Sequence, residues 1–183
     1  NMWGSVINVL LPLELALNAG RPFRHDSPVA FDTVAPASYS AFESLLATVV
    51  SYVDDLAAML IAETATRTQN RGSARPNPFV SALLDDCISR GQDRLLGGCR
   101  YHTVIVEAFG LVNAADALSA IRQLVFREGR FSLIEMVAAA HDDFRSRPDI
   151  LQAIRHIPMY GNGDRDADDM VRHLADCFAQ SVH

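Results

Sequence analysis

Apolar side chains recur at helical spacing through most of the chain. The first such series predicts a helix at the N-terminal end, and its members are Val6, Val9, Leu10, Leu13 and Leu17. Residues 18–20 (NAG) give a left-handed cap signal that ends this helix. Residues 21–36 hold three prolines and show no period, so they are predicted to form a structured loop.

A longer apolar stripe predicts a second helix from about Ser38 to Thr66. Ser40 and Glu43 have the S-x-x-E spacing of a capping box near its start. Residues 69–78 are polar and rich in Pro and Gly, which favours a surface connection. The stripe predicted to be buried consists of Leu45, Val49, Tyr52, Val53, Leu56 and Leu60.

Further helical segments are predicted from residue 78 to the C-terminal end. One covers about 78–90 and stops at Gly91; the next is capped by Asn113. Ser132 and Glu135 form a second capping box for a helix that reaches about residue 145. Pro148 is placed to start another helical turn or two. A last helix, 166–181, follows the Gly/Asn/Asp loop at 160–165.

One segment has the character of a strand. Residues 99–109 are rich in Val, Ile, Thr and Tyr, and they are almost continuously apolar from Thr103 to Val106. This suits a strand covered on both faces, as in a parallel α/β sheet or barrel. A lone strand cannot satisfy its backbone groups. The pattern therefore predicts helices around a sheet whose other strands lie elsewhere.

Composition fits one globular domain over residues 1–183, with 49% hydrophobic and 21% charged residues. The net charge of −6 disfavours nucleic acid or an anionic membrane as partner. The apolar run from Val6 to Leu13 is too short to span a bilayer. No signal peptide is seen, and the three cysteines form no CxxC pair. We expect a reducing, cytoplasmic setting with no disulfide framework and no metal site.

Four stretches resemble one family. Residues 79–91 (FVSALLDDCISRG) and 97–101 (GGCRY) are similar to a run ALxDDCIxxGxD…GGAxYN. Residues 110–126 (GLVNAADALSAIRQLVF) are similar to GxANVADSLAAIKKLVF, and 158–164 (PMYGNGD) to PKYGNDD. Residues 13–20 (LELALNAG) are similar to LELALNNG. These stretches follow one another along the chain in the same order and at about the same spacing as in glycyl radical enzymes of the pyruvate formate-lyase-like family, which the sequence therefore resembles.

The resemblance implies a fold and a chemistry. The family fold is a ten-stranded α/β barrel, of which this chain would be a mostly helical, incomplete segment with one or two strands. The thiyl cysteine lies in a G-C-x-E motif and the radical glycine in a motif such as R-V-x-G-Y, and this sequence contains neither. The chain is thus expected to lie between these two loops. No catalytic residue is assigned to it, and it is expected to be inactive alone.

The complete enzyme, by the same resemblance, would be a lyase or dehydratase. It would break a C–C, C–N or C–O bond in a small molecule, or add a hydrocarbon radical to fumarate. No cofactor is expected to bind this chain. The glycyl radical, outside it, would be installed by a radical S-adenosylmethionine activase with an iron–sulfur cluster. The complete enzyme is expected to be a homodimer that functions without oxygen.

Substrate contacts are expected at the start of the strand, from Tyr101, His102 and Glu107. There the family's YNFTGPQ is replaced by YHTVIVE, with His102 where Asn is common and Glu107 where Gln is common. A His and a carboxylate near a barrel cavity could orient substrate or move a proton. The alternative is that they bond locally and hold adjacent loops.

Other reactive side chains have structural interpretations. Cys99 stands where relatives have Ala and is expected to be a packing residue, while Cys87 and Cys177 are expected on helices. His141 and its neighbours Asp142 and Asp143 point about 100° apart on a helix and do not converge on a metal. Two other functions stay open for the whole chain: a non-catalytic helical scaffold, or a degenerate remnant of the enzyme.

Overall fold

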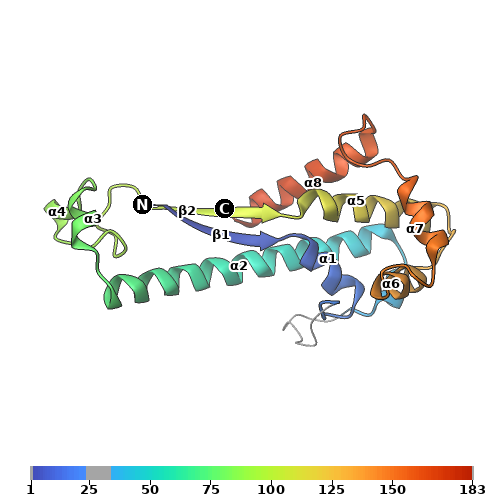
Figure 1. The fold of residues 1–183 in the computed structure, drawn as a ribbon, viewed down its shortest axis with the longest axis horizontal. Helices are drawn as coiled ribbons and strands as arrows, with labels where there is room; N and C mark the ends of the chain where they lie inside the picture. Colours follow the sequence, from blue (N-terminus) through green and yellow to red (C-terminus); the bar gives the residue numbers. More distant parts are fainter. Residues whose placement is uncertain (1, 24–33, 183) are drawn as a thin grey trace. The chain divides into compact units, whose positions relative to one another are not determined.

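The computed structural model describes residues 2–23 and 34–182, so most of the loop expected at 21–36 lies outside the described residues. The chain is mostly helical, with one small sheet of two parallel strands (Figure 1). It divides into two compact units. The strand unit comprises Asp55–Glu107, the described residues up to Ile7, and Val182. The helical unit comprises Asn8–Asp54 and Ala108–Ser181.

The sheet pairs β1 (Met2–Asn8) with β2 (Thr103–Phe109). The strand expected within 99–109 is confirmed, four residues shorter at its start. The prediction of a helix beginning at Val6 is wrong, because Val6 belongs to β1 and helix α1 covers only Leu10–Leu17. Pairing with β2 provides backbone partners that the apolar spacing of β1 alone does not reveal.

Helix α2 (Phe42–Ala74) begins later and ends later than its sequence pattern indicates. It continues through residues 69–74, where a surface connection was predicted. Most of its predicted stripe is buried: Leu45, Val49, Tyr52 and Val53 are each at most 4% exposed. By length and composition alone, α2 could also cross a membrane. Asp54 and Asp55 stand side by side in it, and a carboxylate is costly inside a bilayer.

The helix predicted over 78–90 is two short helices, α3 (Pro78–Ala82) and α4 (Cys87–Arg90). The break comes at Asp86, which has the left-handed φ of 73°, a conformation that no right-handed helix can pass through. Gly91 does end α4, with a φ of 61°. The segment between Ala82 and Cys87 therefore turns back instead of extending one helix.

The helical unit continues after β2 with α5 (Leu111–Ile121) and the π-helix η2 (Arg122–Arg127). The predicted cap at Asn113 is wrong, because α5 begins after Gly110. Gly110 has a φ of 71°, and a Cβ there would lie 2.9 Å from the side-chain oxygen of Asn8. The left-handed backbone conformation therefore favours glycine at the turn from β2 into α5, and a larger residue would also have to displace the Asn8 side chain.

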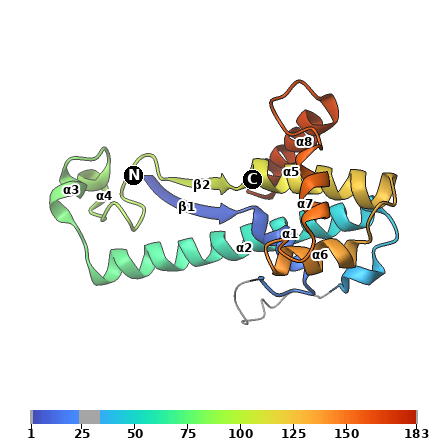
Figure 2. The same cartoon turned by 45° about the vertical axis from the view of Figure 1, so that its right-hand side comes forward.

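The remaining helices of this unit are α6 (Leu133–His141), α7 (Pro148–Arg155) and α8 (Arg165–Ser181), and η1 (Pro36–Ser38) precedes α2. The predicted capping box at Ser132 and Glu135 is confirmed in both directions, and Pro148 stands in the first turn of α7. Helix α5 lies along α8, as Figure 1 and Figure 2 both show. Their shared core includes Ala114, Leu118, Ile121, Ala167, Met170 and Leu174.

Candidate functional site

His102, just before β2, lines a hollow in the strand unit. The hollow has a volume of about 570 Å³ and lies between β2, the second half of α2 and the loop around Leu95. Its other polar side chains come from one face of α2, at Thr64, Thr68 and Gln69. None of the three was predicted as a site residue: Thr64 lies in the predicted helix, whereas Thr68 and Gln69 lie beyond its expected end at about Thr66. Helical spacing at 64 and 68 places both hydroxyls on the same side of α2.

The hollow combines apolar walls with a few polar groups, as small-molecule sites do. An imidazole, two hydroxyls and an amide can donate and accept hydrogen bonds to a hydroxylated or anionic molecule. One of these hydroxyls is already engaged: Thr64 Oγ1 lies 3.0 Å from Ser5 Oγ of β1. This bond fixes the α2 side of the hollow to the sheet, which leaves Thr68, Gln69 and His102 to face a ligand.

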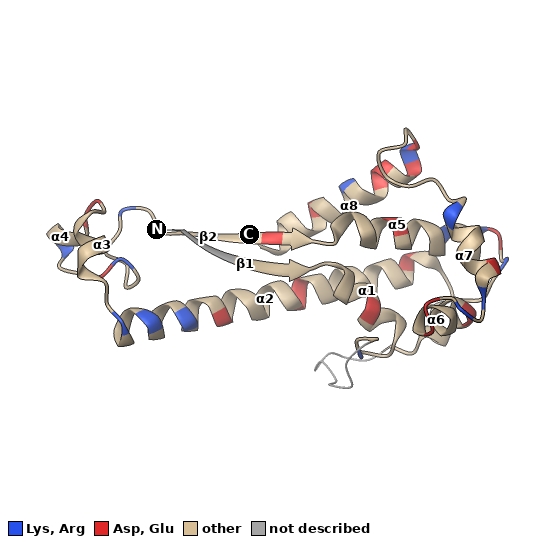
Figure 3. Cartoon of the chain, in the orientation of Figure 1, with Lys and Arg blue, Asp and Glu red and all other residues tan. Residues whose placement is uncertain are grey.

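Glu107 lies on the other face of the same strand. Val106 lines the hollow beside His102, and neighbouring residues of a strand point to opposite faces. Glu107 is exposed and is the acidic residue of β2, a strand that is mostly without charged residues (Figure 3). Tyr101 is 75% exposed. The structure thus brings His102 to a hollow without bringing Glu107 to it, and the substrate contacts of all three residues stay predictions.

The acidic cluster at 141–143 is divided among separate local contacts. The ring of His141 lies 4.5 Å from that of Phe23, between centroids. Asp142 accepts a hydrogen bond from the backbone N–H of Ser146, and the Ser146 side chain lowers the pKa of that carboxyl. Asp143 pairs with Arg145 at 3.5 Å. Within residues 2–23 and 34–182, no three His, Cys, Asp or Glu side chains are grouped to hold a metal ion.

Nearby aspartates accept hydrogen bonds from backbone N–H groups in and just after the loop at 160–165. Asp116 accepts from the Tyr160 N–H, Asp168 from the Gly161 N–H and Asp164 from the Ala167 N–H. These acceptors occupy the amide donors that an anion would use at the start of α8. The loop is therefore a structural connection in which aspartates cap the backbone.

Sequence reasoning missed one close pair of reactive groups. Cys87 and Cys99 are separated by 12 residues, yet their sulfur atoms lie 3.8 Å apart in the strand unit. The segment between them is irregular, so no periodic pattern could have signalled the contact. Cys87 and Cys99 were each expected to be structural residues, and their exposures of 2% and 6% agree with that expectation.

Comparison with known sequences connects this chain to much longer proteins. It is 30% identical over 183 residues to the (2S)-3-sulfopropanediol dehydratase of Klebsiella oxytoca, which covers 96% of the chain and 22% of that enzyme. It is 27% identical to the trans-4-hydroxy-L-proline dehydratase of Clostridioides difficile, with the same two coverages. The chain therefore spans about a fifth of the length of these curated relatives.

Solved structures agree with the sequence matches. A glycyl radical enzyme from Archaeoglobus fulgidus superposes with a TM-score of 0.88 at 25% identity, over 97% of this chain and 22% of that one. The hydroxyproline dehydratase of Clostridioides difficile, solved with its substrate bound, gives 0.88 at 26% identity, over 96% and 22%. The family model described as pyruvate formate lyase-like matches residues 1–183. The chain belongs to the pyruvate formate lyase-like family, as its four sequence stretches indicated.

Proposed function

We propose that this chain is the segment of a glycyl radical dehydratase or lyase that lies between the cysteine loop and the glycine loop. The observation that carries the proposal is the match of the family model to residues 1–183, together with relatives that are dehydratases and a sulfite-lyase. In the complete enzyme, β1 and β2 would be two strands of the ten-stranded barrel. The outer edges of this two-stranded sheet would then pair with strands outside this chain.

The substrate would be a small hydroxylated molecule, and the bond broken a C–O bond. Support comes from the names of two relatives, which are dehydratases of a sulfopropanediol and of a hydroxyproline. A lyase reaction at a C–C or C–N bond is the second possibility within the same family. The hollow beside His102 offers donors and acceptors suited to hydroxyl and carboxylate or sulfonate groups.

His102 would orient this substrate and take or give a proton at one of its hydroxyls. Imidazole suits that role because its ordinary pKa lies near neutral pH. Tyr101 and Glu107 do not line this hollow, so the substrate contacts proposed for them would need a second part of the site, formed in the complete barrel on the other face of β2 or at its entry. Thr68 and Gln69 would hold the polar end of the substrate against α2.

Hydrogen-atom abstraction is the chemistry that the glycyl and thiyl radicals supply from outside these residues. Cys99 does not fit the thiyl position: Tyr101 stands where the G-C-x-E motif has Glu, and the thiol is buried against Cys87. The residues of this chain would bind and orient the substrate and keep water from the reacting carbon. We further propose a radical S-adenosylmethionine activase and a second copy of the enzyme as partners, in the cytoplasm, and no activity for this chain alone.

The test uses the complete reading frame that contains this segment, expressed without oxygen together with its activase. A glycyl radical signal in electron paramagnetic resonance is expected from the complete enzyme, and none from the 183-residue chain treated identically. A radical signal on the chain alone would contradict its predicted inactivity. Failure of the complete enzyme to form any radical would contradict the proposed function.

A matched pair of variants tests the role of His102. His102→Ala is expected to lower turnover of the substrate at least about 10²-fold, as loss of a general acid–base does, with unchanged radical yield. His156→Ala is the control, because its ring bonds the carbonyl oxygen of Gln152 one turn earlier in α7 and does not line the hollow. Equal turnover for the two variants would mean that His102 holds a loop and does not touch substrate.

A further inference from the structure

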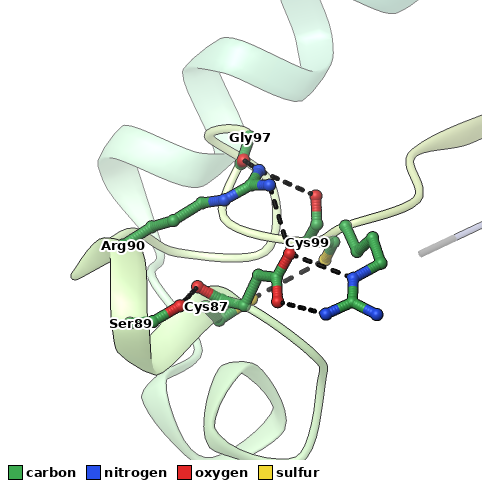
Figure 4. Close-up of polar contacts among 7 residues, drawn as sticks. Cys87, Ser89, Arg90, Gly97 and Cys99 are labelled. Atoms are coloured by element: carbon green, nitrogen blue, oxygen red, sulfur yellow. Dashed lines mark hydrogen bonds and ion pairs between the residues drawn. The ribbon is translucent and has the colours of Figure 1, made fainter.

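Two thiols face each other inside the strand unit. Cys87 Sγ lies 3.8 Å from Cys99 Sγ, and the two residues are 2% and 6% exposed. Figure 4 shows the two sulfurs approaching from α4 and from the segment that leads into β2. The second thiol also contacts the chain locally, since Cys99 Sγ lies 3.5 Å from the carbonyl oxygen of Arg94. Both cysteines are free.

The backbone on either side of the pair is already held together. Arg90 donates to the carbonyl oxygens of Gly97 and Cys99, at 3.2 and 3.4 Å (Figure 4). The N–H of Gln92 donates to the Cys87 carbonyl, which returns the chain toward Cys99. A disulfide requires sulfur atoms about 2.05 Å apart, so closure needs a movement of roughly 1.8 Å. Rotation of the two short side chains can supply most of it without unfolding this segment.

A path from solvent reaches the first of these thiols. Cys87 lines a cavity of about 380 Å³ together with Pro78, Ser81 and Ile88. A molecule as small as hydrogen peroxide can enter such a space, whereas a protein oxidoreductase cannot. Burial, and then the contact with Cys99, raise the pKa of the Cys87 thiol. The thiolate is the reactive form, so the reaction should accelerate as the pH rises.

We propose that Cys87 and Cys99 form a reversible disulfide when the protein meets hydrogen peroxide. The Cys87 sulfur attacks one peroxide oxygen, the O–O bond breaks, and one water leaves after taking up the Cys87 proton. The Cys99 sulfur then attacks the resulting sulfenic sulfur, forming the S–S bond while the hydroxyl departs with the Cys99 proton as a second water. Two thiols lose two electrons in total, and one peroxide becomes two waters.

The disulfide would fasten α4 to the entry of β2. Cys99 lies three residues before His102, so the bond would fix the segment that precedes the candidate substrate hollow. Disulfide formation itself does not depend on the proposed function. It needs only the placement of the two sulfurs, and it would occur whether or not this chain contributes to catalysis.

Peptide mapping of the oxidised chain tests the proposal directly. Trypsin cleaves after Arg90 and Arg94, which separates the two cysteines unless a disulfide joins their peptides. After peroxide treatment at pH 8 we expect peptides 72–90 and 95–100 to be linked, with two of the three thiols lost. A small dithiol should restore all three. The rate should rise about tenfold per pH unit below the thiol pKa.

Two variants complete the test. Cys177→Ala should keep the linked peptides, whereas Cys99→Ala should lose them and send Cys87 to sulfinic acid. The wild-type map decides the matter even if Cys99→Ala does not fold. The proposal would be overturned by oxidation of Cys177 alone, by sulfinic acid at Cys87 in the wild type without a link, or by cross-links only between separate chains.

Discussion

The packing of α5 against α8 supplies the sharpest test of the helical unit. Leu118 is fully buried in α5, and Leu118→Ala removes three carbon atoms from this core. At about 0.8 kcal/mol per buried CH₂, the transfer of these carbons contributes roughly 2.4 kcal/mol. A residual cavity adds to this loss, and comparable buried leucines cost about 2.7–5.0 kcal/mol. We therefore expect the free energy of unfolding to fall by about 3–4 kcal/mol.

Urea unfolding followed by pulse proteolysis measures this loss at low protein concentration. With a slope of about 2 kcal/mol per M, the midpoint should fall by roughly 1.5–2 M. Ile134→Ala is the matched control, since it also removes three carbons within the helical unit but from a side chain that is 57% exposed. It should cost less than about 1 kcal/mol. Equal losses for the two variants would refute the assignment of α5 and α8 to the core.

Three further predictions follow from local contacts. The hydrogen bond from Arg100 lowers the pKa of Asp86 in the folded state. This carboxylate therefore stabilises the fold above its unfolded pKa of about 3.9, and the contribution is lost as the pH falls through the lower folded pKa. Asp86→Asn should reduce the loss of stability at acid pH, measured as unfolding midpoints over a pH series. Ser132→Ala should cost about 1 kcal/mol by thermal melting, because it removes a confirmed capping box; no change would contradict the cap's role. Phe79 and Ile88 are 75% and 74% exposed, so the isolated chain should self-associate in size exclusion, and a sharp monomer peak would count against its being a barrel segment.

Local chemistry made several elements predictable from the sequence. The S-x-x-E spacing at Ser132 specified a capping box because both of its hydrogen bonds lie within one helical turn. Pro148 indicated a helix start for the equally local reason that proline fixes φ and needs no N–H partner. Gly91 likewise ended α4 in the left-handed conformation that glycine adopts easily.

The features that sequence could not supply depend on distant partners. Val6 has helical spacing to its neighbours, but it forms part of β1 because β2, almost a hundred residues later, offers backbone partners. Asp86 breaks a helix without any glycine or proline to signal it, where Arg90 and Arg100 both bind its carboxylate. Helix α5 starts at Leu111, directly after Gly110 in the left-handed conformation, and not after Asn113, because β2 ends there and the chain turns at that glycine.

In the candidate site, too, some features could be predicted from the local sequence and others could not. The replacement of the family's usual residues at the start of the strand directed attention to His102, and that residue does line a hollow. The polar groups opposite it, Thr68 and Gln69, come from a helix that was expected to have ended before residue 69. Strand alternation places Glu107 on the opposite face from Val106, which lines the hollow with His102, and the odd spacing of residues 102 and 107 already implied this in the sequence.

Sequencing the coding DNA on both sides of this segment tests the central claim most directly. The proposal that the chain lies between the two radical loops predicts a G-C-x-E motif shortly upstream of Asn1 and an R-x-x-G-Y motif downstream of His183. Finding both would support the proposal that the chain is part of a complete glycyl radical enzyme. A start codon just before Asn1 and a stop codon just after His183 would contradict the claim and favour a scaffold or a remnant of the family.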